Sequence, residues 1–255
     1  MHNKFNLLVI YLPIFFVSAC SSSIDRTLSP PADTKWVSVE VKNPLPYTKP
    51  FPLEARYISH KCQKKRVSGF DGSVITEPSY NGRKVPLQQQ GSSDVWQARV
   101  AMTGGGSCDW TLSAVSLGIE YIDATHLGKD LVPGTAVGAI IAFDNDASRN
   151  GQFSKAKGKI VLKPNYYPYI LEWNLGERKK ELSLLGETNF ISLKVHDSNE
   201  IEFNPKIDER KVVRYVGIEK KTKGIYSKII YPDGSVAPEK TLFPDFRKVD
   251  EMQLK

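Results

Sequence analysis

The sequence predicts an all-β protein whose body is an antiparallel β-sandwich or a barrel. About a dozen short segments alternate apolar and polar residues or concentrate β-branched and aromatic residues, which is typical of half-buried strands. Gly, Pro, Asn or Asp bounds each of these segments, as expected for turns between strands. No stretch keeps an apolar period of about 3.6 residues over several turns, so we do not expect alternating βα units.

The first half of the chain contains four well-marked strand candidates. They are WVSVEVKN (36–43), LEARYISHKC (53–62), DVWQARVAM (94–102) and CDWTLSAVSLGIEYI (108–122). The dipeptides Asp71-Gly72 and Asn81-Gly82 are turn signals, and we expect a turn at each. The last candidate is long for one strand, and the glycine inside it, Gly118, predicts a β-bulge.

The second half continues the same pattern at short spacing. Its candidates are TAVGAIIAFDN (135–145), GKIVLKP (158–164), YPYILEWNL (167–175), KKELSLL (179–185), NFISLKVH (189–196), EIEFNP (200–205), KVVRYVGIE (211–219) and YSKIIYP (226–232). Residues 144–159 are polar and unpatterned. They either link a β domain over residues 36–150 to a second β unit over residues 151–255, or form one long hairpin loop within a single sheet.

The composition of the last residues predicts an irregular C-terminal arm. Residues 232–255 contain three prolines and little alternation, so neither a regular strand nor a long helix is expected there. Three large apolar residues interrupt this polar stretch. We expect Leu242, Phe243 and Phe246 to dock this C-terminal arm on the body.

The amino terminus has the pattern of a secretory signal peptide. Residues 5–19 are almost wholly apolar, yet they fall short of the roughly twenty residues that a membrane-spanning helix needs. Lys4 supplies a positive charge before them. A buried amino-terminal helix is the alternative, but an unbroken apolar run offers water no polar face. The sequence therefore predicts a signal peptide over residues 1–19.

Val17-Ser18-Ala19-Cys20 resembles the lipobox of bacterial lipoproteins. The resemblance implies that the signal is cut before Cys20, that its sulfur carries a diacylglyceryl group, and that its new amino group carries an acyl chain such as palmitate. Residues 20–35 then form the lipidated start and a flexible tether. In this class an Asp after the cysteine retains the protein at the inner membrane. Ser21 stands there, which favours the periplasmic face of the outer membrane over the inner membrane.

The cysteine count agrees with this resemblance. The chain has three cysteines, an awkward number for an exported protein. If Cys20 is acylated, Cys62 and Cys108 remain as a pair that an oxidising compartment joins. The alternative is two unrelated buried thiols. We expect the disulfide, which places it in the β domain over residues 36–150.

The charge balance excludes no partner except nucleic acid. The formal charge is +7, from 35 basic and 28 acidic residues, and acids interrupt most of the basic clusters. Such clusters are solvated surface, or they attract anionic lipid headgroups or an acidic partner. An exported protein meets little nucleic acid. The expected contacts are a lipid bilayer, through acylated Cys20, and a protein partner in the periplasm.

No cofactor and no metal site is predicted. Asp146, Ser148 and Asn150 precede a glycine as in a calcium loop, but Lys157 stands where the bidentate carboxylate belongs. An Asx-rich turn is the expected structure there. The three histidines of the mature part are too far apart in sequence for a zinc signature: His60, His126 and His196.

No catalytic residue is predicted either. The run that begins like Gly-x-Ser-x-Gly at Ser107 lacks its second glycine. A cluster of aromatic residues on one strand candidate offers the weak alternative of a recognition surface, although aromatic residues on strands are more often core. These candidates are Tyr166, Tyr167, Tyr169 and Trp173.

The function expected from these observations is non-catalytic binding of a protein or envelope component at the membrane. One specific form is an immunity protein against an envelope-targeting toxin, by analogy with that class. The alternatives are a structural accessory of a secretion or envelope assembly, and a periplasmic hydrolase. The part after the signal also resembles uncharacterised enterobacterial lipoproteins, a resemblance that assigns no functional residue.

Overall fold

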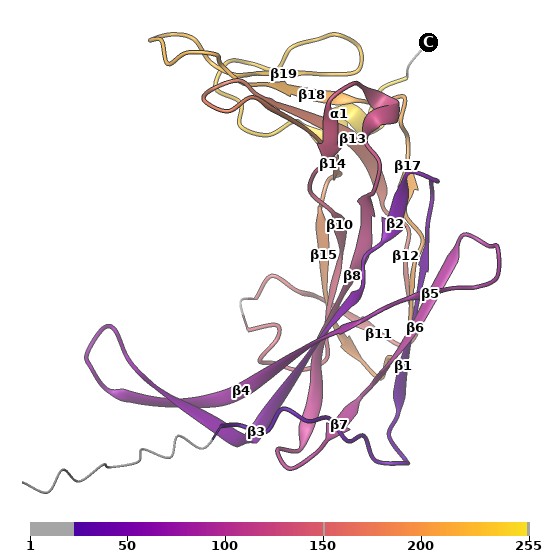
Figure 1. Ribbon diagram of the computed structural model, residues 1–255, viewed down its shortest axis with the longest axis vertical. Helices are drawn as coiled ribbons and strands as arrows, with labels where there is room; N and C mark the ends of the chain where they lie inside the picture. The colour runs from indigo at the N-terminus through magenta and orange to yellow at the C-terminus, as the bar shows by residue number, and fades with distance from the viewer. Residues whose placement is uncertain (1–22, 150, 254–255) are drawn as a thin grey trace, which may run out of the picture.

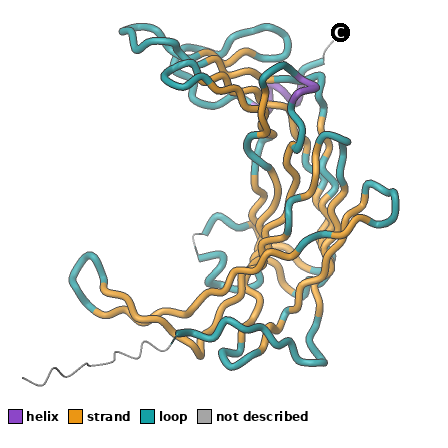
Figure 2. The backbone as a smooth tube through the Cα atoms, viewed as in Figure 1, coloured by secondary structure: helices purple, strands orange, loops and turns teal. Residues whose placement is uncertain are grey.

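A computed structural model describes residues 23–149 and 151–253, which fold into three β-sheets with very little helix (Figures 1 and 2). The all-β class is confirmed. The predicted signal peptide and Cys20 lie outside the described residues. Within the described ranges, no helix has the length and apolar content needed to cross a bilayer.

Two of the sheets face each other and enclose the main core. The five-stranded sheet has the order β12 (Ile160–Leu162), β16 (Glu200–Phe203), β1 (Trp36–Lys42), β6 (Val95–Ala101) and β5 (Gln88–Gln89). The eight-stranded sheet has the order β11 (Ser154–Lys157), β15 (Phe190–His196), β10 (Val137–Ala142), β8 (Trp110–Tyr121), β3 (Leu53–Val67) and β4 (Val74–Val85), with β2 (Thr48–Pro50) and β7 (Thr103–Gly105) also paired to β8.

The core follows from the period-two pattern of these strands. On β1 every second residue is buried, whereas the residues between them point outward. The buried valines of β1 and the buried residues of β8 belong to one hydrophobic cluster between the sheets. Each such side chain stabilises the fold by about 1.5–3 kcal/mol relative to an exposed one. The main contributors from β1 and β8 are Val37, Val39, Val41, Val115, Leu117 and Ile119.

The sheets are mixed, and this departs from the antiparallel body that the sequence predicts. Strand β1 pairs with β16 in parallel, and β10 pairs with β15 in parallel. Both pairs join the first half of the chain to the second half. The boundary near residue 150 therefore does not separate two sheets. Residues 144–159 look like a linker because they are polar, but β11 lies within them, and β12, β15 and β16 after them belong to the same two sheets.

The third sheet closes one end of the molecule. Its strands are β19 (Lys228–Ile230), β18 (Val213–Val216), β13 (Asn165–Trp173), β14 (Lys179–Leu185) and β9 (Leu131–Pro133), with β17 (Lys206–Ile207) also paired to β13. A 3₁₀ helix, η1 (Thr125–Leu127), and one α-helix, α1 (Phe246–Glu251), complete the elements.

Helix α1 docks the end of the chain on this third sheet. The carboxylate of Asp245 accepts hydrogen bonds from the amides of Arg247 and Lys248 and so caps the helix. Val249 is fully buried in a second hydrophobic cluster, and Phe246 packs against that cluster. The docking expected of Leu242 and Phe243 is wrong, because their side chains are 76% and 75% exposed. The sequence pattern missed the short helix that carries the true contacts.

Strands β3 and β4 extend beyond the sheet as a projecting hairpin, which we call the arm (residues 60–78; Figure 1). The pairing of β3 with β8 ends at Ile58, and from Gln63 to Val67 β3 pairs with β4 alone. The turn expected at Asp71-Gly72 lies at the tip of the arm.

Two other sequence predictions for this sheet are wrong. Asn81 and Gly82 lie inside β4, not in a turn, because the Asn81 side chain is buried and donates a hydrogen bond to the Arg26 carbonyl. The bulge on β8 falls at Ser113, where the register with β3 shifts, and not at Gly118. Gly118 instead lies opposite Gly138 on β10, where the backbones approach too closely for a side chain.

Residues 23–35 lie against the body instead of forming the free tether that their composition predicts. The amide of Ser29 donates to the carbonyl of Gly104 at 2.8 Å. Ile24 and Leu28 pack against the main core. The rest of this stretch is mostly polar, so two isolated apolar residues form no periodic pattern from which the contact could be predicted. Of the predicted tether, residues 20–22 lie outside the described part.

Candidate binding site

A groove of about 660 Å³ lies over the outer face of the five-stranded sheet. Its volume is within the range of ligand sites, roughly 300–1,000 Å³. The residues that line it come from four adjacent strands of this sheet, β16, β1, β6 and β5, and from the chain on either side of β5. The polar ones are Ser38, Glu40, Gln88, Gln90, Gln97, Arg99, Glu200 and Glu202.

Strand register arranges the centre of the groove in two rows. Ser38 on β1 lies between Arg99 on β6 and Glu200 on β16. Glu40 lies in the same way between Gln97 and Glu202. These side chains point outward because the residues between them on each strand fill the core, so the alternation that builds the core also builds the groove.

Neighbouring side chains partly neutralise the carboxylates of the groove. Gln97 donates an amide hydrogen bond to the carboxylate of Glu40 at 2.9 Å. The ammonium of Lys159 forms ion pairs with Glu202 and, at 3.8 Å, with Glu200. The hydrogen bond to Glu202, with the neighbouring carboxylates, raises the pKa of Lys159 above its ordinary value. These contacts leave the carboxylate oxygens of the groove only partly available to a ligand.

Arg99 at the edge of the groove has a different environment. Its guanidinium lies 5.2 Å from the ring centre of Trp36, whose side chain is 39% exposed. Among the residues that the structure describes, Arg99 forms no ion pair. A guanidinium held over an aromatic ring keeps its hydrogen-bond donors free at little further cost in side-chain entropy. Trp and Arg are also the residue types most often found at the energetic centre of protein interfaces.

The weak alternative of an aromatic recognition surface on β13 fails for three of its four candidates, which are core residues, as aromatic residues on strands more often are. Tyr166, Tyr167 and Tyr169 are buried, with 6% exposure or less. Strand β13 is covered on both faces: Tyr166 belongs to the main core, and Tyr167 and Tyr169 belong to the second cluster under α1. Burial raises the pKa of Tyr169 to about 12. Trp173 is 44% exposed and packs against Tyr215 at the end of the strand.

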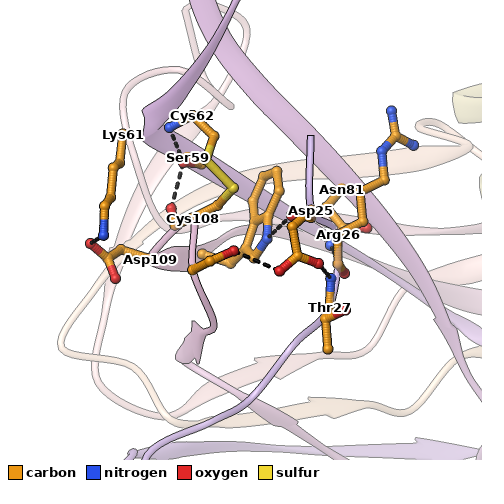
Figure 3. Close-up of a disulfide and its surroundings, with 11 residues drawn as sticks. Asp25, Arg26, Thr27, Ser59, Lys61, Cys62, Asn81, Cys108 and Asp109 are labelled. Carbon is orange, nitrogen blue, oxygen red and sulfur yellow. Dashed lines mark hydrogen bonds and ion pairs between the residues drawn. A yellow bond between two sulfur atoms is a disulfide. The ribbon is translucent and has the colours of Figure 1, made fainter. Parts of the chain in front are cut away.

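The predicted disulfide between Cys62 and Cys108 is confirmed (Figure 3). It joins the base of the arm to the turn between β7 and β8. The hydroxyl of Ser59 lies beside it, donating to the carbonyl of Cys108 at 2.5 Å and accepting from the amide of Cys62 at 2.9 Å. The bond links positions 46 residues apart. Because it ties Cys62 to the turn before β8, it fixes where the arm leaves the sheet.

The start of the described chain is bound next to this disulfide (Figure 3). The carboxylate of Asp25 accepts hydrogen bonds from the hydroxyl of Ser107 at 2.6 Å and from the amide of Thr27 at 2.9 Å. These bonds, the one from Ser107 first, lower the pKa of Asp25 to about 2. The indole of Trp110 donates to the carbonyl of Asp25 at 3.1 Å. Ser107 thus holds the segment in place, and no hydrogen bond joins it to a described histidine.

The three histidines in the described part of the chain lie in separate surroundings. His60 lies 3.4 Å from a carboxylate oxygen of Asp146, and His196 ends β15. His126 stacks on Tyr47 and contacts the carboxylate of Glu209 at 2.7 Å. In the described ranges, no three His, Cys, Asp or Glu side chains are grouped as a metal site would need.

The segment that resembles a calcium loop contains an Asx turn. The carboxylate of Asp144 accepts a hydrogen bond from the amide of Ala147 at 2.7 Å, and the hydroxyl of Ser148 donates to the carbonyl of Asp144 at 3.0 Å. Asn150 lies outside the described residues.

Sequence reasoning did not single out the groove. The alternation of WVSVEVKN and DVWQARVAM places Trp36 and Arg99 on the outer faces of their strands. The pairing that brings them together joins strands about sixty residues apart, which no local pattern encodes. No protein-family model, no curated protein and no solved structure matches this chain.

Proposed function

We propose that this chain is a periplasmic lipoprotein, anchored to the outer membrane through acylated Cys20, that binds a protein partner without catalysis. The groove over the five-stranded sheet is its binding site. The observation that carries the proposal is Arg99, which is stacked on a half-exposed Trp36 at the edge of the groove and has no ion pair among the described residues.

The anchor is supported by the lipobox-like sequence and by the position of the chain that follows it. Cys20 precedes Ser23, the first described residue, by three positions, a reach of at most about 11 Å. The segment after Ser23 is hydrogen-bonded to the body through Asp25 and Ser29. Lipid chains at Cys20 therefore hold the disulfide end of the body close to the bilayer.

The chemistry of the groove defines the kind of partner that fits it. Arg99 offers donors to a carboxylate or a backbone carbonyl, and Trp36 offers an apolar face beside them. Glu40, Gln97, Glu200 and Glu202 supply carboxylate and amide oxygens, which suit amide and ammonium donors from the same partner. A polar protein loop with an acidic side chain satisfies both requirements. An envelope-targeting toxin is one such partner, and the protein is then its immunity protein.

The experiment is recovery of the partner from membranes solubilised in mild detergent. The tagged wild-type chain is compared with Arg99→Ala, and Arg56→Ala is the matched control. Arg56 also lies over an aromatic ring, Tyr80 at 5.6 Å, but on the eight-stranded sheet. We expect one stoichiometric partner with wild type and with Arg56→Ala, and at least about tenfold less with Arg99→Ala, because a hot-spot side chain contributes about 2 kcal/mol or more.

Two outcomes contradict the proposal. Equal recovery of the partner by Arg99→Ala and wild type excludes the groove as the binding site. Recovery of many components in a fixed ratio replaces a single-partner function with a structural role in an assembly.

A further inference from the structure

The tip of the arm exposes a group of apolar side chains to solvent. Phe70 is 100% exposed, and the flanking Val67 and Val74 are 68% and 64% exposed. Val67 and Val74 lie directly opposite each other on β3 and β4, so their side chains share one face just below the turn. The three residues form a small convex apolar tip.

The turn that carries Phe70 has a defined structure. The amide of Ser68 donates to the carbonyl of Ser73 at 2.8 Å, and the amide of Gly72 donates to the carbonyl of Ser68 at 3.0 Å. The carboxylate of Asp71 accepts from the amide and the hydroxyl of Ser73, which closes an Asx turn. These bonds hold Phe70 at the outermost point of the arm.

Basic residues surround the apolar tip. The arm, residues 60–78, has four Lys or Arg residues and two acidic residues, a formal charge of 4 − 2 = +2 with histidine neutral. Lys64 and Arg66 share Glu77, each at 3.1 Å, and these contacts, that of Lys64 first, lower the pKa of Glu77. Among the described residues, Lys65 forms no ion pair. Net positive charge is therefore available beside the tip.

The arm leaves the body at the end where the described chain begins (Figure 1). Its base is held by the disulfide, and the side chains of Asn81 and Arg83, just past the arm on β4, both donate to the carbonyl of Arg26. Cys20 lies six positions before Arg26, so a lipid on Cys20 is at most about 22 Å from that carbonyl. The arm base and the proposed anchor thus approach the same surface.

We infer that the arm is a second membrane contact, in which Phe70 and its two valines insert into the interface of an anionic bilayer while the neighbouring cations contact the headgroups. Its orientation rests on the anchor proposed above. A convex tip of aliphatic and phenyl side chains, flanked by solvated cations, fits the boundary between acyl chains and anionic headgroups. A protein partner is less well matched, because the tip has no concavity and no polar group among its three apolar side chains to set a specific register.

The experiment separates the arm from the anchor. The mature chain with Cys20→Ser, made without acyl chains, is mixed with vesicles of phosphatidylglycerol and phosphatidylcholine, or of phosphatidylcholine alone, and bound protein is measured by co-sedimentation. We expect measurable binding to the anionic vesicles and at least about fivefold weaker binding to the neutral ones. Each cation near an anionic surface is expected to raise the affinity about fivefold. Added salt is expected to reduce the difference.

Matched variants locate the contact. Phe70→Ser is expected to weaken binding to anionic vesicles by about tenfold, the factor for removing one large apolar side chain from a membrane interface. Phe243→Ser, at a 75% exposed phenylalanine elsewhere on the chain, is expected to change nothing. Lys65→Gln is expected to weaken binding about fivefold, and the exposed Lys221→Gln not at all. All four substituted side chains are exposed, so these variants are expected to keep the wild-type melting temperature.

Three results overturn the inference. They are equal binding to anionic and neutral vesicles, equal binding by Phe70→Ser and wild type, and no binding to any vesicle. Failure of the anchor is seen separately, as an unmodified Cys20 in the intact protein, and leaves the vesicle result for the arm unchanged. Loss of a protein partner in Phe70→Ser with unchanged vesicle binding assigns the tip to protein recognition instead.

Discussion

Asp25 is the residue that most directly couples the start of the described chain to the body. Its carboxylate has a pKa of about 2 because Ser107 and then Thr27 donate hydrogen bonds to the ionised form. A lowered pKa in the folded state means that these bonds stabilise docking of the segment above the ordinary pKa, about 3.9. The contribution is lost as the pH falls from that value through about 2.

The first prediction follows from this hydrogen bond. Ser107→Ala is expected to raise the pKa of Asp25 toward its ordinary value, because the largest stabilising contact is removed. The measurement is an NMR titration of the Asp25 carboxyl carbon. Ser73→Ala, which removes the equivalent serine from Asp71, is the control and is expected to leave Asp25 unchanged. A wild-type midpoint near 3.9 contradicts the account of how this segment is held.

Single residues also show which functional features a sequence pattern can reveal. The disulfide could be predicted because the cysteine count and the expected oxidising compartment both favour pairing of Cys62 with Cys108. Whether Tyr166, Tyr167 and Tyr169 are buried or exposed could not be settled from the sequence. A strand covered on both faces, as β13 is, has the same composition as one with an aromatic outer face. The stacking of Arg99 on Trp36 depends on a long-range pairing and has no local signal.

At the scale of elements, the contact between β8 and β10 is the least tolerant part of the main sheet. A Cβ atom on Gly138 would lie 1.9 Å from the carbonyl oxygen of Leu117, and one on Gly118 would lie 2.0 Å from that of Val137. Real Cβ atoms do not approach backbone oxygens so closely, so the strands would have to separate. The two glycines are therefore a requirement of the pairing between β8 and β10.

The second prediction tests this requirement. Gly138→Ala is expected to lower the free energy of unfolding by about 3 kcal/mol or more, because overpacking at a backbone contact disrupts the central sheet. Gly82→Ala on β4 is the matched control, since an added Cβ there meets nothing within 4 Å. Urea denaturation followed by circular dichroism measures both. A cost below about 1 kcal/mol for Gly138→Ala contradicts the packing described for these strands.

The strands show where local patterns are informative and where they are not. Most strands fall within the segments that alternation predicts, because a strand half-buried in a sandwich needs that period. The pairing of those strands could not be predicted: parallel neighbours such as β1 and β16 are joined through most of the chain. The Asn81-Gly82 turn signal failed because the buried amide of Asn81 is satisfied by the distant Arg26 carbonyl.

At the scale of the whole molecule, the surfaces proposed for function lie on different parts of one framework. The sandwich carries the groove on the outer face of the five-stranded sheet, and the eight-stranded sheet extends into the arm. The disulfide and the segment from residue 23 onward meet at the base of that arm. The proposed membrane-bound end and the proposed partner-binding face therefore lie on one folded framework.

The alternation of apolar and polar residues predicted the all-β class better than it predicted the architecture. The all-β class and the disulfide followed from local chemistry. Neither the joining of both halves in shared sheets nor the docking of residues 23–35 was visible, because each depends on contacts between segments far apart in sequence. The anchor at Cys20 stays a prediction, and the proposed orientation of the arm depends on it.

The most direct test of the account is mass spectrometry of the amino-terminal peptide of the protein isolated from membranes. We predict a peptide that begins at Cys20 and carries the added mass of a diacylglyceryl group and an acyl chain. We also predict that Cys20→Ala leaves the membrane fraction. A peptide with an unmodified Cys20, or a Cys20→Ala variant that fractionates like wild type, contradicts the proposed membrane anchor.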